Sequence, residues 1–316
     1  MKRLALATSL VAILLTHGTW LVFTQAPPRP PARTEQVTKD LYLMSGEGGN
    51  VAAYVTSEGV VLVDDMYDRN HADILAAVKQ ITDRPLKYVF NTHQHDDHAG
   101  GNARLLPLAE VIAHRNARAN LAAKKQPFFE ETPGAPIGLP RVTFSDEASV
   151  FVGGKEVRAY HFGRGHTNGD AIIYFPDEKV IHTGDLYLAT RAPQGRGTAA
   201  APDRPVGVTM YVDYAQGGSF IDWTRTLDRA LALDVERVIP GHGPIATRAD
   251  LARYRADLET MRNRVAGLIR QRRTRDEMVR IMETDYGWRA TGCPPSPLRS
   301  GCLQYQQIDA MLEELK

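Results

Sequence analysis

Three histidines and two aspartates fall within six consecutive residues of this 316-residue chain. Four of them, His93, His95, Asp97 and His98, form the pattern His-x-His-x-Asp-His shortly after an apolar run at residues 86–90. Neutral imidazole nitrogens and carboxylate oxygens bind zinc at ~2.0–2.2 Å. Because side chains on one tight loop can point to two sides, this spacing predicts ligands for two metal ions ~3.5–4 Å apart. A structural role without metal is a poor explanation of the pattern.

A two-metal site needs further ligands, including a carboxylate that bridges the ions. Three candidates follow later predicted strands, and a glycine precedes each of them: His166, Asp185 and His242. Glycine lets the backbone turn sharply and brings the next side chain close to the site. A residue at any one of these positions is more often an ordinary loop residue. Together with the first motif, however, the three supply the remaining ligands of a two-metal site. Asp64, at the end of a buried strand, is expected to hold the histidine loop by hydrogen bonds rather than to bind metal.

The spacing of apolar residues indicates which elements position these side chains. In the first half, the predicted strands at residues 50–57, 59–64, 86–90 and 109–113 are followed by helices at 70–82, 101–106 and 115–124. In the second half, the predicted strands are residues 142–144, 149–152, 155–161, 170–175, 179–183 and 237–239. Ser219 is expected to cap one helix, and capping boxes at Thr247 and Thr274 to begin two more. Strands inside and helices outside predict an α/β fold, a four-layer αββα sandwich with a C-terminal helical extension.

The ordered motifs resemble those of the metallo-β-lactamase superfamily over roughly residues 50–244. The resemblance implies an αββα sandwich with its site at the sheet edge. It implies a first zinc ion held by His93, His95 and His166, and a second held by Asp97, His98 and His242. It also implies that Asp185 bridges the ions and that Asp64 takes the family's structural acidic position.

A pair of zinc ions points to hydrolysis, because zinc lowers the pKa of bound water to about 7. We expect the metal-bound hydroxide to attack the carbonyl of an amide, ester, lactone or thioester, with β-lactams among the substrates. Asp97 is expected to orient this nucleophile. Asn168 and Tyr187 are weaker candidates for a hydrogen bond to the oxyanion, since both could equally be ordinary loop or strand residues. Two alternatives stay open: a di-iron oxidoreductase of the same superfamily and a non-catalytic zinc-binding module.

The sequence does not indicate the substrate, because many hydrolases share this type of site. One β-lactamase subclass has a zinc-binding cysteine where this chain has Asp185, and a substrate-binding lysine where it has Leu188. Both differences weaken a specialised antibiotic-degrading role. Residues 186–217 are predicted to form a loop or lid whose arginines could bind an acidic substrate: Arg191, Arg196 and Arg204.

The N-terminus predicts export, because Lys2 and Arg3 precede an apolar stretch at residues 4–23. We divide the chain into a signal peptide or anchor at 1–26, a Pro-rich tether at 27–40, a metallo-hydrolase domain at 41–250 and a helical extension at 251–316. The protein is expected in the periplasm or outside the cell, and tethered to the membrane if residues 4–23 are not cleaved. Cys293 and Cys302 could pair as a disulfide there or remain free thiols.

The composition agrees with a folded protein that acts on small molecules. A content of 43% hydrophobic and 24% charged residues excludes a disordered chain. The 38 lysines and arginines against 37 aspartates and glutamates leave a formal charge of +1. This balance lacks the basic excess of a nucleic-acid-binding protein. We therefore expect a small-molecule substrate and no nucleic-acid partner.

Overall fold

Two β-sheets form the middle of the structure. The computed structural model of the chain describes residues 32–123, 138–189, 210–288 and 302–316, all of which belong to one compact unit. Within these residues the first sheet has seven strands, ordered as in the sequence. The strands are β1 (Arg33–Gln36), β2 (Leu41–Ser45), β3 (Val51–Val55), β4 (Val60–Val63), β5 (Leu86–Asn91), β6 (Glu110–His114) and β7 (Val142–Phe144). Neighbouring strands are antiparallel from β1 to β4 and parallel from β4 to β7.

The second sheet has six strands in the described residues, in the order β13-β12-β11-β10-β9-β8. They are β8 (Glu147–Val152), β9 (Lys155–Tyr160), β10 (Ile172–Phe175), β11 (Val180–His182), β12 (Arg237–Ile239) and β13 (Ala246–Thr247). Strands β11 and β12 are parallel, and the other neighbours are antiparallel.

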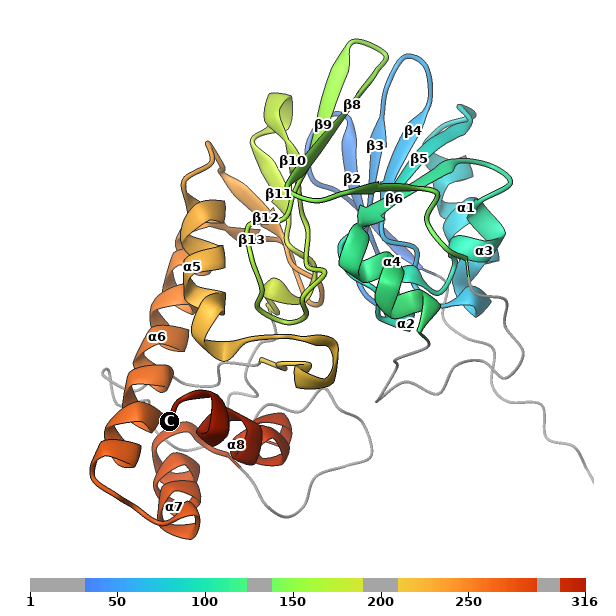
Figure 1. Ribbon diagram of the computed structural model, residues 1–316. Helices are drawn as coiled ribbons and strands as arrows, with labels where there is room; N and C mark the ends of the chain where they lie inside the picture. Colours follow the sequence, from blue (N-terminus) through green and yellow to red (C-terminus); the bar gives the residue numbers. More distant parts are fainter. Residues whose placement is uncertain (1–31, 124–137, 190–209, 289–301) are drawn as a thin grey trace, which may run out of the picture. The chain divides into compact units, whose positions relative to one another are not determined.

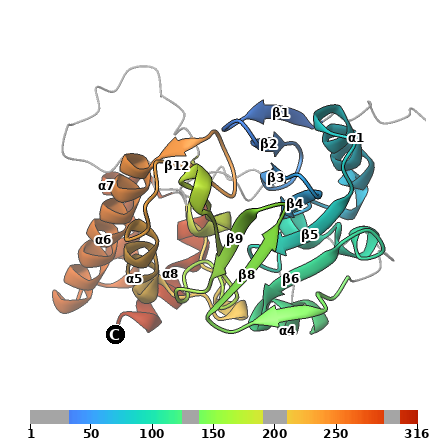
Figure 2. The same cartoon turned by 90° about the horizontal axis from the view of Figure 1, so that it is seen from above.

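Helices cover the outer faces of both sheets. The first half contains α1 (His71–Ile81), α2 (Asp96–Ala99), α3 (Asn102–Leu105) and α4 (Arg115–Ala122). The second half contains α5 (Phe220–Leu231), α6 (Arg248–Arg270), α7 (Arg275–Tyr286) and α8 (Cys302–Glu314). Figures 1 and 2 show α5 and α6 beside the second sheet and α1 beside the first, on opposite sides of the two sheets.

Strand residues alternate between two cores, as the period of two along a strand requires. In β10, Ile173 and Phe175 join the cluster between the sheets, whereas Ile172 and Tyr174 join the cluster under α5 and α6. The side chains of strand β4 alternate in the same way between the central cluster and the cluster under α1. The three clusters separate four layers, and the predicted αββα sandwich is confirmed.

One predicted boundary needs correction. Residues 33–36, placed in the tether, form β1 and pair antiparallel with β2. All four side chains of β1 are exposed. The segment therefore has no apolar alternation that could have marked it as a strand, and backbone pairing alone reveals it. The boundary at residue 250 falls inside the first turn of α6.

The predicted helix starts are confirmed by their hydrogen bonds. The Ser219 hydroxyl accepts from the backbone N–H of Asp222 at 3.0 Å. Thr247 and Thr274 both begin helices with complete capping boxes. Among the described helices, none combines the length and apolar character that a membrane span requires. The predicted signal or anchor, the arginines of the predicted lid and Cys293 lie outside the described residues.

The cap of α6 gives a test of local stability. Thr247→Ala removes the hydroxyl that accepts from the Asp250 N–H, so we expect the free energy of unfolding to fall by about 1 kcal/mol. Thr260→Ala is the matched control, because Thr260 is exposed within the same helix and alanine favours helix there. Urea unfolding measures the free energy of unfolding of both variants. Equal stability of the Thr247→Ala variant and the unsubstituted chain would contradict the assigned cap.

Candidate metal centre

All seven candidate ligands lie just beyond the ends of strands. Those of the first motif follow β5 in a loop that runs into α2. His166 follows β9, Asp185 lies in a 3-10 turn (Gly184–Leu186) after β11, and His242 follows β12. Loops at strand ends bring residues that are far apart in sequence to one place. The structure brings together every residue that the sequence proposed as a metal ligand.

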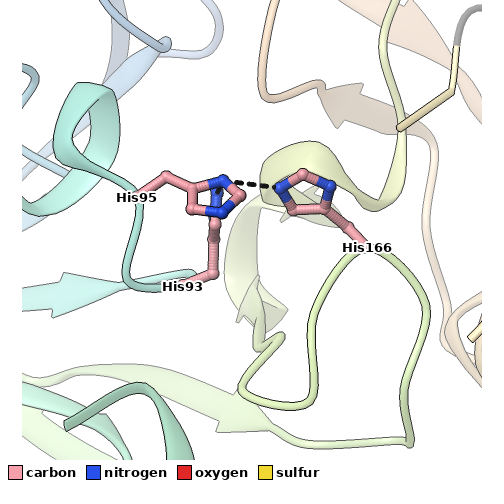
Figure 3. A group of neighbouring side chains, drawn as sticks. All are labelled: His93, His95 and His166. Atoms are coloured by element: carbon pink, nitrogen blue, oxygen red, sulfur yellow. Dashed lines mark hydrogen bonds between the residues drawn. The ribbon is translucent and has the colours of Figure 1, made fainter. Parts of the chain in front are cut away.

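The first group consists of His93, His95 and His166, which point toward one another in Figure 3. The Nδ1 atom of His95 lies 3.2 Å from Nε2 of His93 and 2.9 Å from Nε2 of His166. Nitrogens that share one tetrahedral zinc ion at ~2.0–2.1 Å are about 3.3 Å apart. The three rings are at most 2% exposed. This arrangement has the spacing and the burial of a three-histidine metal site.

The second group consists of Asp97, His98 and His242. The Nε2 atom of His242 lies 3.2 Å from Oδ2 of Asp97 and 3.2 Å from Nε2 of His98. The Nε2 atom of His98 is 3.6 Å from the same Asp97 oxygen. Two imidazoles and one carboxylate thus converge beside the first group.

Asp185 lies between the two groups and offers one oxygen to each. Its Oδ1 is 3.1 Å from Nε2 of His98 and 3.4 Å from Nε2 of His242. Its Oδ2 is 3.7 Å from Nε2 of His166, in the first group. A carboxylate in this position can bridge two cations.

The electrostatics of both groups favour cations. Burial, reinforced by the neighbouring His98 and His166, holds the pKa of His93 well below its usual range. Burial also lowers the pKa of His166 to about 4, so both rings are neutral near pH 7 and keep the lone pairs that a metal needs. At the second group, carboxylates outweigh burial and raise the pKa of His98 well above its usual range.

Asp97 has one carboxylate oxygen without a hydrogen-bond partner among the described residues. This atom, Oδ1, is buried. A buried polar atom of this kind costs free energy unless it meets a cation, a water or a donor. Together with the opposed histidine nitrogens, this oxygen shows that the residues present fit a metal site.

The second nitrogens of three rings are held from outside the site. Nδ1 of His98 lies 2.7 Å from Oδ2 of Asp64, and Nε2 of His95 lies 2.9 Å from Oδ2 of Asp213. Nδ1 of His166 donates to the carbonyl oxygen of Tyr211 at 2.7 Å. Such contacts fix the ring orientation and decide which nitrogen faces the metal.

Asp64 lies behind His98, where the sequence analysis expected a supporting acid. It also accepts from the backbone N–H of Thr92 at 2.7 Å and from the Thr92 hydroxyl at 2.8 Å. Its φ of 63° is in the left-handed region, which is uncommon for a residue with a side chain. These contacts tie the end of β4 to the start of the histidine loop.

The two proposed oxyanion donors have other contacts. Oδ1 of Asn168 accepts from Nδ2 of Asn120 at 2.9 Å. Tyr187 is 7% exposed, and its ring packs edge-on against Tyr254 with 5.0 Å between centroids. No contact among the described residues brings either side chain to the ligand groups, so their oxyanion roles stay predictions.

Sequence reasoning missed Asp213 and Tyr211. Both lie in the segment predicted only as a loop or lid. The one local signal is that Asp213 caps a 3-10 turn (Tyr214–Gln216) by accepting from the Gln216 N–H, and this signal marks a turn rather than a metal site. Asn50 was also missed, although its Nδ2 donates to the carbonyls of Pro240 and Gly243 on both sides of His242.

Comparison with known proteins agrees with the fold and the ligand groups. Residues 44–242 match the model of the metallo-beta-lactamase superfamily. The chain belongs to this superfamily. A metallo-beta-lactamase type 2 of Bacillus cereus is 26% identical over 218 residues, which cover 67% of this chain and 74% of that protein. Metallo-beta-lactamase IND-1 of Chryseobacterium indologenes is 24% identical over 191 residues, covering 60% and 69%.

Solved structures share the fold. The crystal structure of the DIM-1 metallo-beta-lactamase has a TM-score of 0.57 at 20% identity, and the match covers 74% of this chain and 100% of that chain. The resemblance read from the motifs is thus confirmed. The superfamily match ends at His242, and α6, α7 and α8 follow it.

The close approach of Gly241 to Asp185 gives a test of the centre. A Cβ atom at Gly241 would overlap Oδ1 of Asp185 and would lie 2.6 Å from the Gly184 carbonyl carbon. Gly241→Ala must therefore displace Asp185, and we expect zinc affinity to fall about 10- to 100-fold.

Gly267→Ala serves as the control, because the nearest atom to its added Cβ is the end of the Arg270 side chain at 3.7 Å. Zinc titration against a chromogenic chelator compares the two variants. Unchanged zinc affinity in Gly241→Ala would show that Asp185 does not take part in metal binding.

Proposed function

We propose that this metallo-beta-lactamase superfamily member is a hydrolase that holds two zinc ions and cleaves the carbonyl group of a small molecule. The observation that carries the proposal is the position of Asp185, with one oxygen toward each of two ligand groups. Its superfamily membership and the names of its relatives support hydrolysis. The proposed substrates are amides, esters, lactones and thioesters, with β-lactams included.

Two zinc ions would supply a water of lowered pKa and would polarise the substrate carbonyl. His93, His95 and His166 would hold one ion, and Asp97, His98 and His242 the other, with Asp185 between them. The neutral histidines keep the first group open to a cation at neutral pH, since burial lowers the pKa of His166 to about 4.

Asp97 would have a second role in the reaction. Its Oδ2 faces His242 at 3.2 Å, whereas its Oδ1 is buried without a hydrogen-bond partner among the described residues. This free oxygen can orient a water molecule and accept its proton. Burial at 3% exposure keeps bulk water from competing for it.

The substrate range is proposed to extend beyond β-lactams. Leu188, where one β-lactamase subclass has a substrate-binding lysine, is 5% exposed and apolar, so this position cannot supply a cation for a substrate carboxylate. The relatives named metallo-beta-lactamase support β-lactam cleavage. A panel of carbonyl substrates is therefore more informative than one antibiotic.

We also propose that the protein is exported. The support is the basic and apolar character of residues 1–26, which is typical of a signal peptide or an uncleaved anchor. Export would place the enzyme in the periplasm or outside the cell, tethered to the membrane through residues 4–23 if the segment is retained.

The test combines metal analysis with hydrolysis of a chromogenic cephalosporin, an acyl lactone and an acyl thioester. The unsubstituted chain is expected to hold two zinc ions and to hydrolyse at least one substrate. His95→Ala and Asp97→Ala should each lower kcat/KM by at least about 10²-fold, because each removes a ligand, and Asp97→Ala also removes the proton acceptor.

His71→Ala is the matched control, since His71 begins α1 and belongs to neither ligand group. It should keep both zinc ions and full activity. Full activity in either ligand variant would reject the assigned roles. A purified chain that takes up no zinc would reject the proposed function as a whole, and iron in its place would favour the oxidoreductase alternative.

A further inference from the structure

Residues 210–219 supply outside partners to two of the three histidines in the first group. Asp213 offers Oδ2 to Nε2 of His95 at 2.9 Å, and the Tyr211 carbonyl accepts from Nδ1 of His166 at 2.7 Å. The backbone N–H of Asp213 also donates to the carbonyl of His166 at 2.8 Å. The placement of this segment therefore sets the orientation of two metal-facing rings.

The Asp213 carboxylate is itself held in place. Nε2 of Gln216 donates to Oδ2 of Asp213 at 2.6 Å, and Oε1 of Gln216 accepts from Nε2 of Gln94 at 2.8 Å. Gln94 lies between His93 and His95 in the sequence, so this chain of hydrogen bonds connects Asp213 to the first motif. Asp213 is 1% exposed. A buried carboxylate so closely bound has little freedom to follow a moving histidine.

Helix α8 holds the same segment from the opposite side. Oε1 of Gln307 accepts from the backbone N–H of Val212 at 3.0 Å, and Nε2 of Gln307 donates to the Val212 carbonyl at 2.5 Å. Val212 stands between Tyr211 and Asp213, the two residues that contact the histidines. One side-chain amide thus satisfies both backbone groups at the centre of the segment, in the way that a neighbouring strand would.

A second residue of α8 fixes the end of the segment. The Glu314 carboxylate accepts from the Tyr214 hydroxyl at 2.9 Å, the Ser219 hydroxyl at 2.5 Å and the backbone N–H of Phe220 at 2.9 Å. Between these polar contacts, Ile308 and Met311 are fully buried in the cluster that contains Met210 and Val212. Figure 1 shows α8 beneath the end of α5 where this segment enters the helix.

We propose that Gln307 and Glu314 are positioning residues for the first metal group. They hold residues 210–219 so that Asp213 and the Tyr211 carbonyl keep the rings of His95 and His166 in the metal-binding orientation. The inference rests on the proposed function, because it assumes that the group binds zinc. Helix α8 lies beyond residues 44–242, so the C-terminal extension would support a centre whose ligands all come from the superfamily region.

The test measures zinc affinity of each group separately in the full-length chain. A His242→Ala background removes a second-group ligand and reports on the first group. A His93→Ala background reports on the second group and leaves residues 210–219 untouched. We expect Gln307→Ala to weaken zinc binding about 10-fold in the first background and to leave it unchanged in the second.

Two further variants show whether the effect passes through Asp213. Asp213→Asn should weaken the first group about 10- to 100-fold. The loss of zinc affinity that Gln307→Ala causes should then be smaller when Asp213→Asn is already present than when it is absent, because both changes act on one network. A residue that only stabilises the fold would give independent effects and would weaken both groups alike.

Glu314→Gln keeps the shape of the side chain and decides the question if Gln307→Ala does not fold. It should weaken the first group selectively, whereas Glu313→Gln, on the exposed neighbour, should have no effect. Circular dichroism and the Tm of the metal-free variants check folding. Wild-type affinity at the first group in folded Gln307→Ala and Glu314→Gln would overturn this inference alone. An unsubstituted chain that binds no zinc would overturn the proposed function and this inference with it.

Discussion

The structure depends on an electrostatic constraint at the sheet edge, where histidine nitrogens and carboxylate oxygens are buried against one another. Nδ1 of His95 lies about as far from two other ring nitrogens as ligands of one zinc ion lie from each other. Neutral nitrogens whose lone pairs converge repel one another unless a cation lies between them. Asp185 and Asp97 add negative charge beside them. The divalent cation that we propose for each group would relieve the repulsion between the nitrogens and neutralise the carboxylates, and the rest of the fold keeps the groups in place.

The sandwich provides this placement through its strand ends. The buried side chains of β4 and β10 alternate between two cores, so a slip by one residue would send each of them into the other core. Because the register is fixed, the loops that carry the ligands begin at fixed positions at the strand ends. Supporting contacts then set the ring angles, from Asp64 on one side and from Asp213 on the other. On the side of Asp213 this support continues into α8.

Much of this arrangement could be predicted from the sequence, for identifiable reasons. The His-x-His-x-Asp-His spacing is a local pattern, and the fully buried run of β4 signals a strand covered on both faces. Helix starts at Ser219, Thr247 and Thr274 follow from side chains that bond within three residues. By contrast, β1 has four exposed side chains and forms through backbone pairing. The contact of Asp213 with His95 joins residues 118 positions apart, and no local pattern encodes it.

The most direct test of two adjacent cations is anomalous diffraction at the zinc absorption edge from crystals of the zinc-loaded protein. We expect two anomalous peaks ~3.5–4 Å apart. One should lie among His93, His95 and His166, and the other among Asp97, His98 and His242, with Asp185 between them. A single peak, or peaks away from these residues, would contradict this expectation.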